Sequence, residues 1–439
     1  MNSPKKAHPG LAPRERAHTI IHEVLDRRRP FDEVQKSDQR FAKLETRDRA
    51  FARNLIATVL RRLGQIDAII DDCLNRPLPR SAAAARNALR LGICQILFLD
   101  TQTHAAVDTS VTLAARRGPD RFRGVVNAIL RRVARGDADA LKQKFGDHLN
   151  VPDWLGKSWE TSFGTETAAA IARTHLLTPP LDLTAAAEAD SWAEKLGGER
   201  IGTSTVRVTG GGDVTTLDGY ADGAWWVQDA AAALPATLLL NSLSGGSVCD
   251  LCAAPGGKTA QLAAAGLQVT AADASATRLG ILSKNMARLK LSAAVVEADI
   301  LTWEPEAQFD GVLLDAPCTA TGTIRRHPDI PHLKKAADVS RQADLQKKLL
   351  DRAAEWVRPG GVLVYSVCSL EPGEGRDQIS ALLARTCDLE LLPPQPGDVA
   401  DFEACVSEDG LIQTTPAHLG ERGGVDGFFV ARLRKKETV

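Results

Sequence analysis

The chain has 439 residues, of which 44% are hydrophobic and 25% are charged. This composition is typical of a globular protein, and the length is about twice what one hydrophobic core usually supports, so two or three domains are expected. Eight cysteines in a chain of this length are too few for a disulfide scaffold, and we expect reduced thiols in the cytoplasm.

The N-terminal segment MNSPKKAHPG carries positive charges, but the apolar segment of a signal peptide does not follow it. No stretch approaches the roughly 18 apolar residues that a membrane-spanning helix requires. We therefore expect a cytoplasmic protein without a membrane partner.

The formal net charge of −1 conceals an uneven distribution of charge. Residues 1–150 contain 28 Lys and Arg against 17 Asp and Glu, whereas residues 151–439 contain 26 against 38. Such asymmetry indicates a basic module that faces a polyanion; the alternative is a solvated basic face on a helical domain. All seven tryptophans lie beyond residue 150, which favours a domain boundary near that position.

The basic third has the periodicity of helices. After Pro13, the residues Ala17, Ile20, Ile21 and Val24 fall on one helical face, and similar patterns follow at about 46–74, 82–99, 104–117 and 122–135. We predict an all-α bundle of roughly five to seven helices. Arginines cluster near the ends of these segments: Arg27–Arg29, Arg61, Arg62, Arg116, Arg117, Arg121, Arg123, Arg131, Arg132 and Arg135. Guanidinium groups suit RNA phosphates, so any RNA contact here should be mainly electrostatic.

The middle of the chain is less distinctive. Residues 137–150 have the polarity of a linker, and residues 151–245 mix helical stretches with glycine-rich loops. We interpret the latter as a small α/β subdomain that leads into the main catalytic domain.

From residue 247 the sequence alternates between strand and helix. Strand patterns at 247–252, 265–273, 292–299, 309–317 and 360–369 are separated by helical patterns at about 257–265, 275–290, 340–357 and 374–385. This alternation predicts an α/β domain with a mainly parallel, doubly wound, Rossmann-like sheet. Residues 428–436 should add an antiparallel strand at one edge.

Each of the five parallel strands ends in a carboxylate or a thiol. These residues are Asp250 and Cys252, Asp273, Asp299, Asp315 with Cys318, and Cys368. Ligands of such sheets bind at the carboxyl ends of the strands, so we expect these side chains to line one pocket.

The first of these loops, CAAPGGKT at residues 252–259, indicates which class of ligand binds. Glycines allow close backbone approach, and the helix that follows offers free N–H groups. A P-loop would require glycine where Cys252 stands, and the dinucleotide pattern G-x-G-x-x-G is absent. S-adenosylmethionine, a nucleoside without a polyphosphate, fits. Asp273 would then accept from the ribose hydroxyls and Asp299 from the adenine amino group.

Cys249 and Cys252 form a C-x-x-C pair. A zinc site would need a second pair at finger spacing, and we find none, so we expect no metal. Cys249 lies inside a strand that we predict to be buried, which argues against a redox pair. We therefore place Cys249 in the core and Cys252 beside the ligand.

Cys318, in DAPCTATG, and Cys368, in YSVCSLEP, follow neighbouring strands. Free cysteines are often simply buried, but both thiols lie in turn sequences at the ligand edge. Methylation of cytosine at C5 needs a nucleophile, because a thiolate that adds to C6 activates C5 for attack on a methyl sulfonium. This chemistry alone leaves either cysteine as the nucleophile.

The motifs DLCAAPGGKTAQL, DAPCTATGTIRRHPD and YSVCSLEPGEG resemble those of the RNA 5-methylcytosine methyltransferases of the RsmB/Sun (Nop2/NSUN-type) family. The basic helical part is similar to the NusB-like RNA-binding domain that precedes the catalytic domain in members that methylate 16S ribosomal RNA. The resemblance implies a NusB-like domain at residues 1–143, a linking subdomain at 144–245 and a class I methyltransferase domain at 246–439.

The resemblance also implies roles for single residues. In this family the nucleophile is the cysteine of the later motif, here Cys368, and Cys318 assists release. Asp315 would border the cofactor and hydrogen-bond the target cytosine, and Lys258 would orient substrate or cofactor or simply begin a helix. The methionine end of the cofactor would be lined by Cys252, Ala253, Ala254, Pro255, Gly256, Gly257 and Lys258.

The motif RRHPD adds two expectations. Arg325 and Arg326 could meet RNA phosphates, and His327 is expected to brace a loop rather than act as a base. In one place the chain departs from the family: after Pro179 and Pro180 a strand commonly ends in Arg and Asn, whereas this chain has LDLTAAAEAD.

We therefore predict a monomeric enzyme that methylates C5 of a cytosine in 16S ribosomal RNA with S-adenosylmethionine. Two alternatives remain: a tRNA cytosine-C5 methyltransferase, and a NusB-like RNA-binding factor with an inactive methyltransferase domain. A nucleoside triphosphatase is disfavoured by the loop at residues 252–259.

Overall fold

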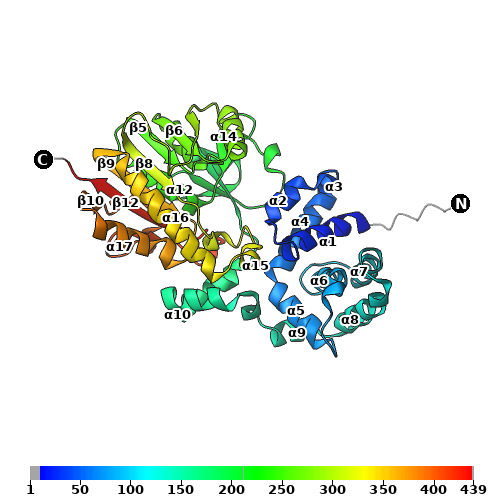
Figure 1. Ribbon diagram of the computed structural model, residues 1–439. Helices are drawn as coiled ribbons and strands as arrows, with labels where there is room; N and C mark the ends of the chain where they lie inside the picture. The colour runs from blue at the N-terminus through cyan, green and yellow to red at the C-terminus, as the bar shows by residue number, and fades with distance from the viewer. Residues whose placement is uncertain (1–9, 211, 438–439) are drawn as a thin grey trace. The chain divides into compact units, whose positions relative to one another are not determined.

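The computed structural model describes residues 10–210 and 212–437, and the chain divides into two compact units (Figure 1). We call the first the helical unit; it comprises the chain up to Glu160 together with Ala168–Leu177 and Arg326–Lys334. The second, the sheet unit, comprises Thr161–Thr167, Thr178–Arg325 and the chain from Lys335 onward. The three-domain division at residues 143 and 245 stays a prediction.

The helical unit is a bundle, as its periodicity predicts. Its helices up to residue 144 are α1 (Leu11–Leu25), α2 (Phe31–Ser37), α3 (Gln39–Ala42), α4 (Thr46–Arg61), α5 (Leu63–Asp72), α6 (Ala83–Leu97), α7 (Thr103–Arg117), α8 (Arg123–Arg135) and α9 (Ala138–Lys144). Their apolar faces share one core that includes Ile20, Leu55, Ile66, Leu89 and Leu130. The segment expected as one helix at 46–74 is two, because Arg62 (φ −107°, ψ 16°) leaves helical geometry.

A short segment from late in the sequence belongs to the helical unit. Residues Arg326–Lys334 contain helix α15 (Ile330–Leu333). Asp329 accepts a hydrogen bond from the backbone N–H of Phe31 at 2.9 Å, and Nε2 of His332 lies 2.8 Å from the carbonyl oxygen of Leu60. His327 pairs with Asp32 at 3.4 Å, a bracing contact of the kind expected for this histidine.

The sheet unit is built around an eight-stranded sheet in which seven strands follow the order β10-β12-β9-β8-β5-β6-β7 and β11 pairs with β12. Strands β5 (Ser247–Leu251), β6 (Gln268–Asp273), β7 (Ala294–Glu297), β8 (Phe309–Asp315) and β9 (Val357–Val367) are parallel, as the alternation of patterns predicts. The remaining strands are β10 (Leu389–Leu391), β11 (Ile412–Gln413) and β12 (Phe429–Lys435).

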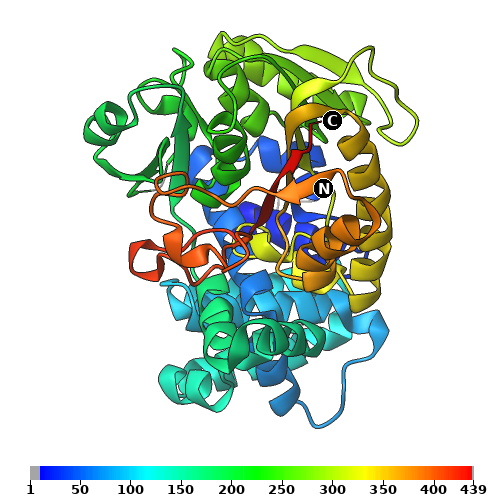
Figure 2. The same ribbon diagram turned by 90° about the vertical axis from the view of Figure 1, so that its left-hand side faces the viewer.

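Helices cover both faces of this sheet, so residues that alternate along a strand enter two different cores (Figures 1 and 2). Leu314 packs with α16 (Ala336–Glu355) and α17 (Arg376–Arg385), whereas its neighbour Leu313 packs with α12 (Ala230–Leu240). Helices α13 (Gly257–Ala264) and α14 (Ala276–Leu289) connect β5, β6 and β7. This is the doubly wound architecture expected from the sequence.

The last strand has the predicted antiparallel direction but not the predicted place. Strand β12 pairs with β9 on one side and with β10 on the other, so β10 forms the edge. The three residues of β10 are too few for a period-2 pattern to be recognised.

Residues 178–245 contribute a separate antiparallel sheet to the sheet unit. It has the order β2-β3-β1-β4, from β1 (Leu181–Ala185), β2 (Gly198–Ile201), β3 (Thr205–Val208) and β4 (Trp225–Val227), with α11 (Ala189–Lys195). Helix α10 (Asp153–His175) precedes it and is kinked at Gly164, where φ is +79°. In the part of the chain described, no helix is long and apolar enough to cross a membrane.

Candidate active site

The parallel strands bring most of the predicted site residues to one edge of the sheet. Strands β6, β5, β8 and β9 are neighbours in the sheet and run parallel. Their carboxyl ends therefore lie side by side. Asp273, Cys252, Cys318 and Cys368 follow these four strands or end them.

The loop at residues 252–258 is shaped by one glycine and anchored by α14. Gly256 has φ +102°, and a Cβ there would lie 2.9 Å from Cγ of Leu282, so only glycine fits. Asn285 donates to the carbonyl oxygen of Pro255 at 2.9 Å, and the guanidinium of Arg278 donates to that of Ala254. The sequence pattern did not predict that Asn285 and Arg278 anchor this loop.

Asp273 holds the same loop. The backbone N–H of Ala254 donates to Oδ2 of Asp273 at 3.2 Å, that of Ser275 donates to Oδ1 at 3.0 Å, and Arg278 forms an ion pair with it at 3.3 Å. A carboxylate has about four acceptor sites, so capacity for a ligand hydroxyl remains.

Asp299, in contrast, stands apart. It is exposed after β7 and accepts a hydrogen bond from the backbone N–H of Leu301 at 3.0 Å. Within the described residues its side chain makes no hydrogen bond or ion pair with another predicted site residue.

Lys258 and Asp315 form a partly buried ion pair. Nζ of Lys258 lies 2.8 Å from Oδ2 of Asp315, and Ser366 donates to Oδ1 of Asp315 at 2.9 Å. The Lys258 ammonium also lies 5.2 Å from the centroid of the Phe428 ring. These contacts show that Lys258 orients Asp315; that it orients substrate or cofactor stays a prediction.

The two predicted catalytic cysteines lie in contact. Sγ of Cys318 is 3.4 Å from Sγ of Cys368, which is hydrogen-bond distance for sulfur and far beyond the length of a disulfide. The hydrogen bond to Cys368, followed by burial and the nearby carboxylate of Glu374, raises the pKa of Cys318 well above its ordinary value. Cys318 is therefore a proton-bearing thiol at neutral pH.

A buried carboxylate ties the loops of the two cysteines together. Glu374 is fully buried; its Oε1 accepts from the backbone N–H of Thr319 at 2.8 Å, and its Oε2 accepts from Ser369 at 2.6 Å and from the Thr319 hydroxyl. Gln346 donates to Oε1 at 3.2 Å and to the carbonyl oxygen of Pro317 at 2.9 Å. Thr319 and Ser369 each directly follow one cysteine, so Glu374 fixes their separation.

Sequence reasoning missed the role of Glu374. Its place six residues after Cys368, in a Pro-Gly-Glu-Gly turn, is typical of an exposed acidic turn residue. Only the tertiary fold shows that the side chain points inward.

Asp250 carries an unmet hydrogen-bonding capacity at the same end of β5. It is fully buried; Oδ2 accepts from Thr259 at 2.6 Å, whereas Oδ1 has no hydrogen-bond partner among the described residues. Burial raises the pKa of Asp250 to about 7. A cationic or donor group of a ligand would satisfy the free oxygen.

The remaining thiol of the loop is not reactive. Burial, together with the surrounding carboxylates, raises the pKa of Cys252 above its ordinary value, so it stays protonated. Cys249 is fully buried in β5, as expected, and burial also raises its pKa.

The expectation that Arg325 meets RNA phosphates is wrong. Arg325 is fully buried and pairs with Asp229 at 2.7 Å and with Asp426 at 2.6 Å. These two carboxylates come from distant parts of the sequence, so the RR dipeptide gave no sign that its first arginine was structural.

Comparison with known proteins identifies the chain. The NusB family model matches residues 11–135, and the model of 16S rRNA methyltransferase RsmB/F matches residues 237–434. Ribosomal RNA small subunit methyltransferase B from Shewanella oneidensis is 35% identical over 403 residues, which cover 89% of this chain and 91% of that protein. The enzyme of that name from Cronobacter sakazakii is 34% identical over 413 residues, covering 90% and 92%. The chain belongs to the RsmB/F family of 16S rRNA methyltransferases.

Solved structures agree with the fold of this RsmB/F family member. The protein PH0851 superposes with a TM-score of 0.76 at 22% identity, covering 98% of this chain and 100% of that chain. A methyltransferase homolog from Pyrococcus horikoshii superposes with a TM-score of 0.53 at 27% identity, covering 64% and 93%. The NusB-like bundle and the Rossmann-like methyltransferase fold are thereby confirmed.

Proposed function

We propose that this RsmB/F family member methylates C5 of a cytosine in 16S ribosomal RNA, with S-adenosylmethionine as methyl donor, through a covalent cysteine–C6 adduct. The observation that carries the proposal is the pair of thiols 3.4 Å apart at the ends of the neighbouring strands β8 and β9. Transfer of a methyl group to oxygen or nitrogen would need neither thiol.

The residues at the strand ends suit S-adenosylmethionine. Backbone N–H groups at the start of α13 and the free oxygen of Asp250 can meet its charged methionine end, and Asp273 keeps acceptor sites for ribose hydroxyls. Asp299 is exposed and open to an adenine amino group. When bound, the cofactor supplies the methyl group as an electrophilic carbon on a sulfonium. The rest of the lining would be Cys252, Ala253, Ala254, Pro255, Gly256, Gly257, Lys258 and Asp315.

In the proposed mechanism Cys368 is the nucleophile. Its thiolate adds to C6, the C6–S bond forms, and the electron pair of the C5–C6 double bond makes C5 nucleophilic. Asp315, oriented by Lys258 and Ser366, hydrogen-bonds the cytosine and assists its protonation. After C5 is methylated, a base removes the C5 proton, the C5–C6 double bond re-forms, the C6–S bond breaks and Cys368 leaves as a thiolate.

Cys318 assists this release. Its pKa is raised, first by the hydrogen bond to Cys368, and its Sγ lies 3.4 Å from that of Cys368, close to the bond that must break. The choice of Cys368 as nucleophile follows the family resemblance, because cysteine chemistry alone left it open.

The reaction is tested by transfer of labelled methyl groups to purified 16S rRNA and to tRNA, followed by bisulfite sequencing. We expect one protected cytosine in 16S rRNA. Transfer to tRNA alone would overturn the substrate, labelling outside C5 would overturn the chemistry, and absence of transfer to any RNA would favour an RNA-binding factor with an inactive domain.

The cysteine roles are tested by denaturing electrophoresis of enzyme with RNA and cofactor. Cys368→Ala should abolish turnover and give no adduct, whereas Cys318→Ala should accumulate a covalent RNA adduct. Cys387→Ala is the matched control, because Cys387 is exposed after α17 and should leave turnover unchanged. An adduct in the Cys368 variant alone would reverse the two roles.

A further inference from the structure

A pocket with a volume of about 450 Å³ lies in the sheet unit at the carboxyl end of β9. Its lining comes from α10 near the kink, from the loop after β9, from β11 and from the start of β12. The residues predicted to bind the cofactor lie at β5, β6, β7 and β8, on the other side of β9, and none of them lines this pocket. The proposed mechanism therefore leaves the pocket unused.

The pocket adjoins the loop that carries the predicted nucleophile. Leu370 and Pro372 line it, two and four residues after Cys368. At about 3.5 Å of chain per residue, their Cα atoms lie within about 7 Å and 14 Å of that of Cys368. Phe429, which also lines the pocket, pairs in the sheet with Val367, the residue before Cys368. A strand of RNA with its cytosine at Cys368 can thus reach the pocket with a neighbouring nucleotide.

One histidine of the lining offers a hydrogen-bond donor. Nδ1 of His418 accepts from the backbone N–H of Thr415 at 2.8 Å. Burial lowers the pKa of His418, so the ring is neutral at pH 7 and carries its proton on Nε2. Within residues 10–210 and 212–437 that Nε2–H makes no hydrogen bond, so it is available to a ligand.

The same lining offers an acceptor. Nε2 of Gln413 donates to the carbonyl oxygen of Thr414 at 3.0 Å and to that of Phe428 at 3.1 Å. These two bonds orient the amide, and its Oε1 accepts no hydrogen bond from the part of the chain that the structure describes. The pocket therefore presents both a donor and an acceptor to its occupant.

The pocket has little net charge. Arg376 is the one charged side chain among the described lining residues, and it forms an ion pair with Asp409 at 2.6 Å. A phosphate or carboxylate in the pocket would share that single cation with Asp409. The lining consequently favours a neutral ligand over an anionic one.

The apolar part of the lining suits a planar ring. It is supplied by Phe163, which is partly exposed, and by Leu370 and Pro372. Unstacked bases of RNA stack on aromatic side chains and form hydrogen bonds through their edges. We propose that this pocket binds the base of a nucleotide next to the target cytosine and so helps to select the methylated position in 16S rRNA. The proposal rests on the proposed function, which supplies the target cytosine.

The first test measures binding of full-length protein to purified 16S rRNA over a range of salt concentrations, with no cofactor present. Phe163→Ala removes the stacking surface and should weaken binding about tenfold. His418→Asn keeps an acceptor near the place of Nδ1 but removes the Nε2–H, so it should weaken binding in the same direction without disturbing the loop. Wild-type affinity in both variants would overturn the proposal.

Arg376→Gln distinguishes a base from a phosphate in the pocket. With a base there, the slope of log K against log salt should stay unchanged. A slope reduced by about 0.7, the effect of one lost single-strand phosphate contact, would overturn the assignment. The matched control is Ile281→Ala, because Ile281 of α14 is apolar, exposed and outside the pocket. Equal weakening by Ile281→Ala and Phe163→Ala would show a general effect of apolar surface and would also overturn the proposal.

The neighbouring base itself is identified with RNA fragments that contain the methylated cytosine and lack one base at a time on either side of it. Loss of one particular base should raise the wild-type KM about tenfold with little change in kcat. Phe163→Ala should add nothing to that loss, because the effects of removing two partners of one contact are not additive. Additive losses at every position would contradict the proposal.

These outcomes are separable from those of the proposed function. Binding is measured without methyl transfer, so an enzyme without C5 activity could still lose affinity in the Phe163 and His418 variants. Conversely, methylation of C5 in 16S rRNA with an unchanged KM in both variants would overturn this proposal alone.

Discussion

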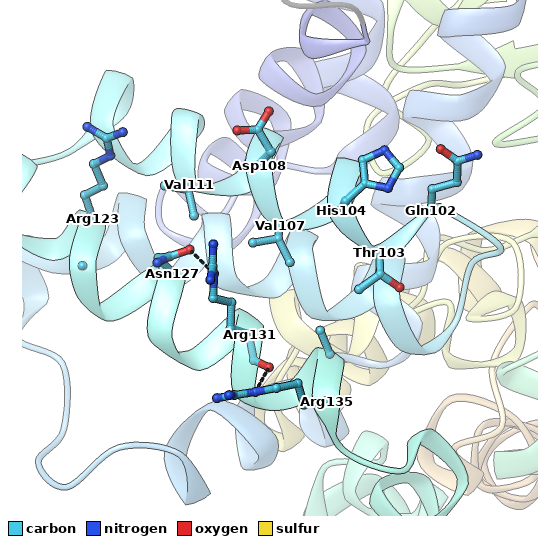
Figure 3. A pocket seen from close by; sticks show the side chains of 12 residues that line it. Gln102, Thr103, His104, Val107, Asp108, Val111, Arg123, Asn127, Arg131 and Arg135 are labelled. Carbon is cyan, nitrogen blue, oxygen red and sulfur yellow. Dashed lines mark hydrogen bonds between the residues drawn. The ribbon is translucent and has the colours of Figure 1, made fainter.

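Buried arginines of the sheet unit contrast with three exposed arginines of the helical unit. In the sheet unit several arginines are buried and matched by carboxylates: Arg207 with Asp182 at 2.7 Å, Arg325 with Asp229 and Asp426, and Arg432 with Asp398 at 2.9 Å. In the helical unit Arg123, Arg131 and Arg135 are exposed without a carboxylate partner among the described residues (Figure 3). Burial thus separates arginines that hold the fold together from arginines that remain available to a ligand.

The strand in LDLTAAAEAD contains another buried ion pair of this kind. Asp182 of β1 is fully buried, and both its oxygens accept from Arg207 of β3 at 2.7 Å. The backbone N–H of Ala230, at the start of α12, donates to the same carboxylate at 3.2 Å. The segment 178–245 therefore uses this strand to join its small sheet to α12.

The largest effect should come from breaking the buried network of Arg325. Arg325→Met leaves the carboxylates of Asp229 and Asp426 buried without their cation, which should lower the free energy of unfolding by about 3–5 kcal/mol. Urea unfolding followed by tryptophan fluorescence reports this. The control Arg341→Met removes a highly exposed arginine of α16 and should cost about 1 kcal/mol or less. Similar losses in both variants would refute the distinction by burial.

The next effect tests whether the buried Glu374 positions the two thiols. Glu374→Gln replaces one acceptor oxygen by an NH₂ group, so the donors from Thr319 and Ser369 can no longer all be satisfied. We expect kcat to fall about 100-fold with an unchanged KM for RNA, because a misplacement near 1 Å costs about that much.

Two further measurements distinguish positioning from loss of stability. The rate at which Cys368 is alkylated should change in the Glu374 variant at temperatures where it is folded, and Glu374→Asp should restore part of kcat. Glu390→Gln, in an exposed position on β10, is the matched control. A raised KM with unchanged kcat would show that Glu374 does not position the thiols.

A smaller effect concerns pH. The pKa of Asp250 is raised to about 7, so the folded protein binds a proton that the unfolded chain, with a pKa of about 3.9, releases. The stabilisation is complete below about pH 4 and is lost as pH rises to about 7, with a slope of up to about 1.4 kcal/mol per pH unit.

Asp250→Asn should remove this contribution, so the difference between wild type and variant should vary with pH over that window. Urea unfolding at half-unit pH intervals measures it, and Asp344→Asn, at an exposed position of α16, serves as the control. A pH-independent difference would mean that Asp250 is charged throughout.

The sequence predicted the architecture because hydrophobic periodicity is local. The five parallel strands and the helices between them lie where their patterns indicate, and the strand ends gather Lys258, Asp315, Cys318 and Cys368. The prediction of a linker at residues 137–150 is wrong, because α9 lies there and packs on the core of the helical unit. The edge strand β10 was not predicted, because three residues are too few to show the period of a strand.

The partners of the buried charged groups could not be predicted, because they are distant in sequence. Glu374 meets Thr319 across 55 positions, and Arg325 meets Asp426 across 101. Composition around Arg325 resembles that around Arg131, and only the fold shows that one is enclosed and the other exposed.

The smallest effect therefore completes the comparison. Arg131→Gln removes an exposed guanidinium that, within residues 10–210 and 212–437, hydrogen-bonds one other side chain, Asn127. The free energy of unfolding should therefore change by less than about 0.5 kcal/mol. Urea unfolding followed by circular dichroism at 222 nm, which reports the helices of both units, measures it beside Arg325→Met. A decrease in the free energy of unfolding well above 1 kcal/mol would show that Arg131 stabilises the fold and is not simply available to RNA. A near-zero change combined with weaker binding of 16S rRNA is what an unused, ligand-facing arginine requires.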